Sequence, residues 1–253
     1  MMQQTITKLH LHLERLVKCN EKEVVLVIVE GPSDEEALGA ILSGYFDENE
    51  VRVYVRRGDI TTEKGNKCSN IIKKVNECVK QHMALYSLRR TDYKEIIQVS
   101  DMDGAFVPDS AIVEDKNAYK PIYSEKEIHT NHPEGIMKRN AQKRENMNRL
   151  ITTNAIGKFP YHIYYMSSNL DHVLYNKLNS TNDEKENDAH NFAEKYKDDL
   201  IGFKSFIQES DFSVNKDFTD SWNYIKQEKH SLERHTNFGL CLEKEENTQE
   251  EKQ

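Results

Sequence analysis

The sequence has few of the features that mark membrane-embedded, secreted or disulfide-stabilised proteins. Its 253 residues include only four cysteines, five prolines and one tryptophan. No apolar run approaches the ~18 residues that a membrane span requires, and residues 1–15 lack the unbroken apolar core of a signal peptide. The cysteines form no CxxC pair, a pattern typical of reduced thiols rather than of disulfides or a zinc site. We therefore expect a cytoplasmic protein that does not enter a membrane.

Charged residues are abundant, and their balance is acidic. Lysine and arginine total 35 against 43 aspartates and glutamates, which gives a formal net charge of −8 in a chain that is 37% hydrophobic. This composition is typical of a globular protein, and its sign argues against indiscriminate coating of nucleic acid. The 253 residues also contain no Gly-x-x-x-x-Gly-Lys pattern, the phosphate-binding motif of many ATPases. Any ATPase or targeting activity is therefore expected to come from a partner protein.

Apolar runs alternate with amphipathic segments through much of the chain. Residues 24–29 are six consecutive apolar residues, typical of a strand buried on both faces of a parallel sheet. Further strands are predicted at 51–55, 96–100 and 161–166, with helices between them. This alternation predicts an α/β fold with a doubly wound, mostly parallel four-stranded sheet.

The rest of the chain is predicted to surround this sheet. The predicted parts are an N-terminal helix at 1–22, an α/β domain at 23–180 with an insertion at about 105–158, a helical C-terminal extension at 181–242 and a disordered acidic tail at 243–253.

Three carboxylates follow two of the predicted strands. Glu30 follows the first strand, and Asp101 and Asp103 follow the third, with Gly104 allowing a sharp turn. Acidic residues also follow buried strands simply because the chain turns into solvent there. Three of them around one sheet edge nevertheless favour a site, because functional groups of such sheets lie at the strands' C-terminal ends. Carboxylate oxygens are the ligands that Mg²⁺ prefers, so the pattern predicts a site for Mg²⁺ or Mn²⁺.

The residues around these carboxylates resemble the two motifs of the Toprim domain. Residues 27–38 give an apolar strand, then Glu-Gly-x-x-Asp and an Ala-Leu helix, which is similar to its first motif. Residues 96–104 give an apolar strand and Asp-x-Asp, which is similar to its second. The resemblance implies that Glu30 is a general acid/base or a metal ligand, and that Asp101 and Asp103 bind Mg²⁺.

The resemblance also implies a class of activity. Toprim domains occur in DnaG-type primases, type IA and type II topoisomerases, small ribonucleases that mature 5S rRNA, and OLD-type phage-defence nucleases. Primases and topoisomerases need further domains for which 253 residues leave no room. By elimination the chain resembles a small standalone Toprim nuclease that hydrolyses phosphodiester bonds of DNA or RNA, in phage defence or in RNA processing.

Three further residues are candidates for the surroundings of the site. Asp34 belongs to the first motif and could tune the metal site, although acidic residues also favour the first turn of a helix. Asp171 and His172 follow the fourth predicted strand and could border the same crevice. Their alternative role is structural, with Asn169 capping a helix.

Two basic segments are predicted to contact the phosphate backbone. One closes the second strand, and the other is a helix at 138–149 with five basic residues and one acidic residue. The helix contributes +4, whereas the tail at 243–253 contributes −3, so the net charge does not exclude a nucleic-acid enzyme. The predicted contacts are Arg56, Arg57, Lys138, Arg139, Lys143 and Arg144.

Two alternatives remain open. Residues 101–110 also resemble the Asp-x-Asp-Gly-Thr opening of HAD-type phosphatases, in which Asp101 would be the phosphorylated nucleophile and Ser167 the next motif. Ala105 replaces the usual threonine, and that scheme leaves Glu30 unexplained. The chain could also be a non-catalytic Toprim-like subunit that binds nucleic acid.

Overall fold

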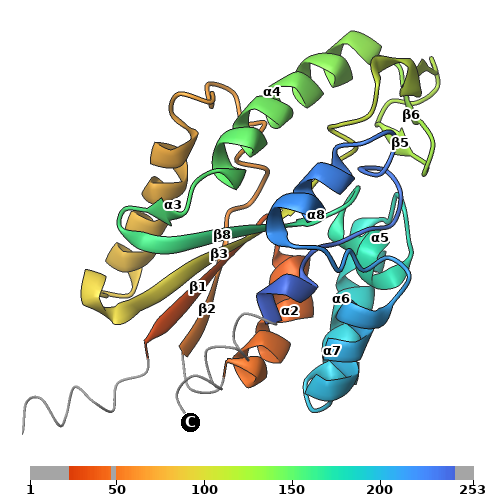
Figure 1. Ribbon diagram of the computed structural model, residues 1–253. Coiled ribbons are helices and arrows are strands. Elements are labelled where there is room, and N and C mark those ends of the chain that lie inside the picture. Colours follow the sequence, from red (N-terminus) through yellow and green to blue (C-terminus); the bar gives the residue numbers. More distant parts are fainter. Residues whose placement is uncertain (1–22, 47–49, 243–253) are drawn as a thin grey trace, which may run out of the picture.

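A five-stranded sheet forms the centre of the structure, a computed structural model that describes residues 23–46 and 50–242 (Figure 1). The strands lie in the order β2-β1-β3-β8-β7. Four strands run parallel, and the short β7 pairs antiparallel with β8. The strands are β1 (Val24–Val29), β2 (Glu50–Val55), β3 (Tyr93–Asp101), β7 (Ala155–Ile156) and β8 (Phe159–Met166).

The predicted α/β class is confirmed, and each predicted strand is present. The sheet is mixed and has five strands, whereas four were predicted. The additional strand is β7. This strand has only two residues, too few to produce a recognisable alternation of apolar and polar positions.

Helices cover both faces of the sheet. The face formed by alternate β1 residues such as Val25 and Val27 packs against α2, α6 and α7, and the opposite face packs against α3, α4 and α8 (Figure 1). Every residue of β1 is buried because it serves both cores, which explains its unbroken apolar sequence. The helices are α2 (Pro32–Tyr45), α3 (Ile71–Leu85), α4 (Pro133–Ile151), α5 (Leu170–Tyr175), α6 (Asn182–Tyr196), α7 (Leu200–Glu209) and α8 (Phe218–Ile225), with 3-10 turns at Arg90–Asp92 and Asp109–Ala111.

The segment between β3 and β8 contains a second, smaller sheet. Its strands are β4 (Ile112–Glu114), β5 (Ile122–Tyr123) and β6 (Ile128–Thr130), in the order β4-β6-β5. A separate small core that includes Ile128 and Leu232 lies beneath them. The chain then enters α4, which returns across the main sheet (Figure 1).

The structure covers only some of the regions for which the sequence made predictions. The predicted N-terminal helix at 1–22 and acidic tail at 243–253 lie outside the described residues. None of the described helices combines the length and the apolar character needed to cross a membrane. Among the described residues Cys68, Cys78 and Cys241 form no disulfide bond.

A buried histidine makes the stability of the fold depend on pH. His82 of α3 is 1% exposed, and its Nδ1 lies 2.6 Å from the Tyr93 hydroxyl on β3. Burial, assisted by the charge of Arg52, lowers the pKa of His82 from 6.5 to about 4. As the pH falls below 6.5, His82 therefore becomes protonated in the unfolded chain but stays neutral in the folded chain. We expect the free energy of unfolding to lose about 2 kcal/mol through this group between about pH 7.5 and pH 5.

Urea unfolding of the parent chain and of His82→Leu at both pH values measures this contribution. The substitution lowers stability at both, because it removes the contact with Tyr93, but the parent should lose about 2 kcal/mol more than the variant on acidification. Equal losses in the two proteins would show that His82 titrates normally in the folded state.

Candidate functional site

Four carboxylates gather where three neighbouring parallel strands end. Glu30 follows β1, Asp59 lies in the loop after β2, and Asp101 and Asp103 are at the end of β3. We call these four residues the carboxylate edge. Their charges act on one another, since Asp59 and Asp103 both raise the pKa of Glu30. The sheet thus brings the predicted Glu30, Asp101 and Asp103 into one site.

Glu30 connects two strands through its side chain. Its Oε1 accepts hydrogen bonds from Ser100 Oγ at 3.0 Å and from the Asp101 amide at 3.2 Å. Burial raises the pKa of Glu30 from 4.5 to about 8, the neighbouring carboxylates add to the rise, and Lys143 opposes it. In the absence of a bound cation Glu30 is therefore mostly protonated at neutral pH.

Asp101 and Asp34 anchor backbone on two sides of the site. Asp101 Oδ1 accepts a hydrogen bond from the Leu170 amide at 2.9 Å, at the start of α5. Burial, followed by repulsion from Glu30, holds the pKa of Asp101 well above its usual value. Asp34 Oδ2 accepts from the Gly31 amide at 2.8 Å, and burial raises the pKa of Asp34 to about 6. Asp34 therefore fixes the turn that follows Glu30.

Lys143 of α4 is the principal cation of the carboxylate edge. Its Nζ lies 2.6 Å from Asp103 Oδ2 and 2.9 Å from Asp59 Oδ2, and its side chain has no exposed surface. Burial lowers the pKa of a lysine, but here the carboxylates outweigh it and hold the pKa of Lys143 well above its usual value. Burial likewise raises the pKa of Asp59, but Lys143 and Thr61 reverse the effect and lower it.

The location of Lys143 corrects the prediction that it contacts nucleic acid from a surface. The position of Asp59 is one that the sequence analysis missed altogether. The signal for it was present, because Asp59 follows the second strand as Glu30 follows the first, and parallel strands end at the same edge.

Two further predicted surface cations instead brace the turn after β3. Arg139 donates from Nη2 to the Asp103 carbonyl at 2.8 Å, and Arg144 donates from Nη1 to the Ala105 carbonyl at 2.8 Å. Asp103 and Gly104 both have positive φ, 49° and 64°. A Cβ at Gly104 would lie 2.6 Å from a Leu232 methyl, so glycine is required there. Arg139 and Arg144 thus hold a sharply turned backbone in place.

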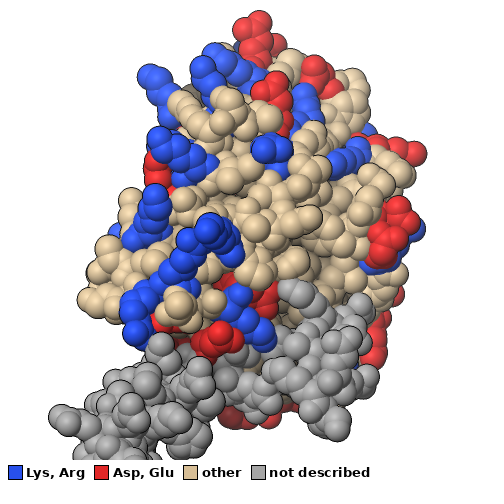
Figure 2. Space-filling model, turned by 60° about the vertical axis from the view of Figure 1, so that its left-hand side comes forward, with Lys and Arg blue, Asp and Glu red and all other residues tan. Residues whose placement is uncertain are grey.

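The other predicted basic contacts differ in their accessibility. Arg56 pairs with Glu63 at 2.6 Å. Arg57 and Lys138 are exposed, and neither has an ion-pair partner in the part of the chain that the structure describes. Lys and Arg side chains recur over the face that carries α3 and α4, with acidic side chains between them (Figure 2). Arg57 and Lys138 remain available to bind phosphate.

Asp171 and His172 are both buried but face different neighbours. Asp171 pairs with Lys185 of α6 at 2.8 Å, and its charge raises the pKa of Asp34. His172 Nε2 lies 3.6 Å from Glu125 Oε1 in the segment between β3 and β8, and burial lowers the pKa of His172. Asp171 thus borders the site, whereas His172 contacts the insertion.

A cavity adjoins the turn that carries Glu30. Its volume is about 710 Å³, within the usual range of ligand-binding pockets, and it opens between the start of α2 and the start of α6. It is lined by Gly31, Pro32, Ser33, Glu36, Asn182, Lys185 and Glu186.

Comparison of the chain with models of known protein families, with curated proteins and with solved structures finds no match. Its function must be inferred from the site itself.

Ser167 lies where the phosphatase alternative requires an accessible hydroxyl. Its side chain is fully buried, and its Oγ accepts a hydrogen bond from the His235 amide at 2.6 Å. The hydroxyl therefore ties β8 to the C-terminal segment. Nothing in this geometry favours the phosphatase.

The donor set at the carboxylate edge suits a hard divalent cation, although its side chains do not surround one point. Within residues 23–46 and 50–242 no group of three or more His, Cys, Asp and Glu side chains is arranged to hold a metal ion. The contacts above explain this, because Glu30 and Asp101 each accept from backbone amides and Asp103 is bound by Lys143. All donors are carboxylate oxygens, as Mg²⁺ and Mn²⁺ prefer. Rotation of these side chains would be needed to bring them around one ion.

Proposed function

We propose that the chain is a Toprim-type nuclease that hydrolyses phosphodiester bonds of DNA or RNA with Mg²⁺ or Mn²⁺. The observation that carries the proposal is the excess of carboxylates over cations at the carboxylate edge. Four acidic side chains share one buried lysine, and burial, to which the neighbouring carboxylates add, raises the pKa of Glu30 to about 8. Strongly perturbed acids at the ends of parallel strands are typical of catalytic sites, and a divalent cation would relieve their repulsion.

Three residues of the carboxylate edge and Lys143 have roles in this proposal. Asp101 and Asp103 would hold the cation, with Glu30 either a further ligand or the general acid/base, and the bound cation would polarise a phosphate oxygen and lower the pKa of water. In the second role Glu30 would take or return a proton at Oε2, because Ser100 and the Asp101 amide both donate to Oε1. Lys143 would hold the Asp103 side chain in position through its 2.6 Å contact.

The exposed cations would orient the substrate. Arg57 lies beside Asp59 in the loop after β2, and Lys138 lies one residue before Arg139, which holds the Asp103 carbonyl. Contacts from such side chains to phosphate fix the register of a strand without reading its sequence.

Cleavage assays on labelled single-stranded DNA, duplex DNA and RNA test the proposal in Mg²⁺, in Mn²⁺ and in EDTA. We expect cleavage with metal and none in EDTA. Glu30→Gln and Asp101→Asn should each reduce the rate by about 100-fold or more, because they remove a proton-transfer group and a ligand. Asp109→Asn is the matched control, since Asp109 is an exposed aspartate in the insertion that follows β3, and it should cleave at the parent rate.

A generic phosphomonoester in the same assay separates the alternatives. Turnover of the monoester that survives Glu30→Gln would overturn the nuclease in favour of the phosphatase. Retained binding of nucleic acid without any cleavage would identify a non-catalytic binding subunit.

A further inference from the structure

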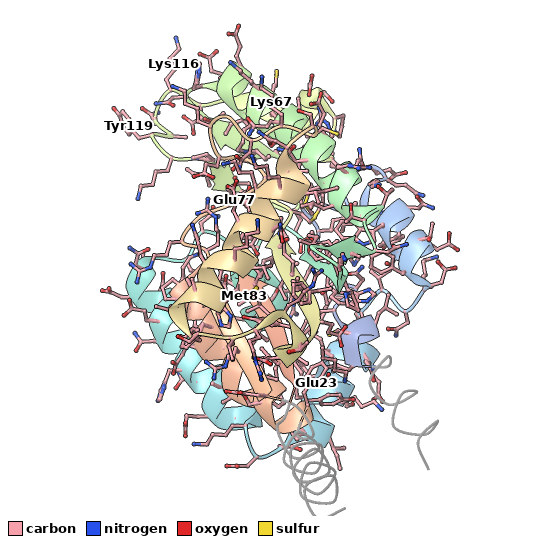
Figure 3. The ribbon with its side chains drawn as sticks, turned by 90° about the vertical axis from the view of Figure 1, so that its left-hand side faces the viewer. Glu23, Lys67, Glu77, Met83, Lys116 and Tyr119 are labelled. Atoms are coloured by element: carbon pink, nitrogen blue, oxygen red, sulfur yellow. The ribbon has the colours of Figure 1, made fainter. Side chains whose placement is uncertain are left out.

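The insertion presents an exposed aromatic ring between two lysines. Tyr119 is 86% exposed, although a tyrosine ring is largely apolar. Lys116 and Lys120 flank it in the sequence, are exposed as well and have no ion-pair partner among the described residues. Figure 3 shows Lys116 and Tyr119 projecting together at the outer edge of the molecule. We call Lys116, Tyr119 and Lys120 the insertion tip.

The backbone beneath this ring is held in place. The Asn117 amide donates to Asp115 Oδ1 at 2.9 Å, and the Ala118 amide donates to the Asp115 carbonyl at 3.0 Å. The Ala118 carbonyl accepts from the Asn131 amide at 3.1 Å, and Ala118 itself is only 2% exposed. The ring of Tyr119 therefore projects from an ordered turn. Less conformational entropy is then lost when a ligand binds, because the turn is already fixed.

The insertion tip is also linked to the carboxylate edge. Tyr123 exchanges two hydrogen bonds of 2.8 Å with the side chain of Asn179, which fixes β5 against the segment after α5. The Tyr123 hydroxyl accepts from Arg139 at 2.6 Å, and Arg139 holds the Asp103 carbonyl. Tyr119 precedes Tyr123 by four residues, so their Cα atoms lie at most about 14 Å apart.

We propose that the insertion tip binds single-stranded nucleic acid, with an unpaired base stacked on Tyr119 and the adjoining phosphates beside Lys116 and Lys120. The proposal rests on the nuclease function and names its substrate class. An exposed aromatic ring with flanking lysines and no acidic residue between 116 and 122 matches the chemistry of a base and its phosphates. Duplexes hide the faces of their bases, so this contact favours unpaired strands.

Equilibrium binding in EDTA tests the proposal without any cleavage. Fluorescence anisotropy is measured with a labelled 20-nucleotide oligo(dT), the corresponding oligo(U) and a hairpin duplex of the same length. We expect the parent chain to bind the single strands more tightly than the hairpin. Tyr119→Ala should weaken single-strand binding about 5- to 100-fold, and Tyr119→Phe should retain it, because the ring is what stacks. Ile201→Ala is the matched control, since Ile201 is 85% exposed in α7, and it should bind as the parent does.

The outcomes separate this proposal from the proposed function. Parent-like binding by Tyr119→Ala, with cleavage intact, overturns the stacking role while the nuclease stands, and it would point to a protein partner for this surface. Equal affinity of the parent for hairpin and single strands overturns the substrate class. Absence of binding by the parent to all three probes, together with absence of cleavage, overturns both proposals.

Discussion

The Lys143→Met variant is expected to lose about 3 kcal/mol of its free energy of unfolding, because two partly buried carboxylates then lose their charged partner. The ammonium group has no exposed surface and contacts Asp103 and Asp59 at 2.6 and 2.9 Å. Methionine fills similar space but supplies neither charge nor hydrogen bonds. Urea unfolding near neutral pH, followed by circular dichroism, measures the loss.

Two further variants make this result specific. Lys138 lies on the same helix but is exposed, so Lys138→Met should change stability by no more than about 0.5 kcal/mol. Adding Asp59→Asn and Asp103→Asn to Lys143→Met should recover part of the loss, because the unpaired charges are removed with the lysine. If Lys143→Met proved as stable as Lys138→Met, the lysine would not be what holds the carboxylate edge together.

The Glu30→Gln variant is expected to be more stable than the parent chain at alkaline pH while being inactive. The pKa of Glu30 is about 8 in the folded chain, against an ordinary value of 4.5. Below pH 4.5 both states carry the proton. As the pH rises toward 8 the unfolded chain ionises and the folded chain does not, so the free energy of unfolding falls, by on the order of 4 kcal/mol in total. Glutamine cannot ionise, so the variant lacks this fall.

Unfolding in EDTA at about pH 5 and pH 8.5 isolates the effect as the difference between parent and variant. Glu114→Gln, in which an exposed glutamate is replaced, should follow the parent at both pH values. Addition of Mg²⁺ should restore part of the parent's alkaline stability, because a ligand that binds only the folded state stabilises it. Parallel pH profiles for the parent and Glu30→Gln would show that Glu30 ionises normally in the folded chain.

The main sheet could be predicted from the sequence because β1, an interior strand, must be apolar on both faces. Residues 24–29 are all buried, and this continuous run located β1 and implied parallel neighbours. The small sheet of the insertion was not predictable in the same way. Its strands have only two or three residues, so no alternation can develop, and its core includes the distant Leu232.

Only part of the candidate site could be predicted from the sequence. Glu30 and Asp101 could be placed because parallel strands end at one edge, and the same rule applied to the second strand would have found Asp59. Lys143 was predicted to contact a phosphate backbone, and therefore to be exposed, because its helix is rich in basic residues. On α4, however, Asn140, Lys143 and Asn146 all have 0% exposure, and they bind the loops after β2 and β3. A polar stripe at three-residue spacing can thus be the inner face of a helix.

The place of β8 beside β3 has a consequence for how the chain folds. Ile96 of β3 pairs with Tyr161 of β8, and the whole insertion and α4 lie between these two strands. The conformational entropy of closing so long a loop must be overcome before any β3–β8 contact contributes. The contacts of β1 with β2, by comparison, join segments much closer in sequence. The pairing of β1 with β3, for example of Leu26 with Ile96, spans a similar length of chain. We therefore expect the addition of β3 and β8 to the sheet, and with it the Asp101 contact to the start of α5, to belong to the late and slow part of folding.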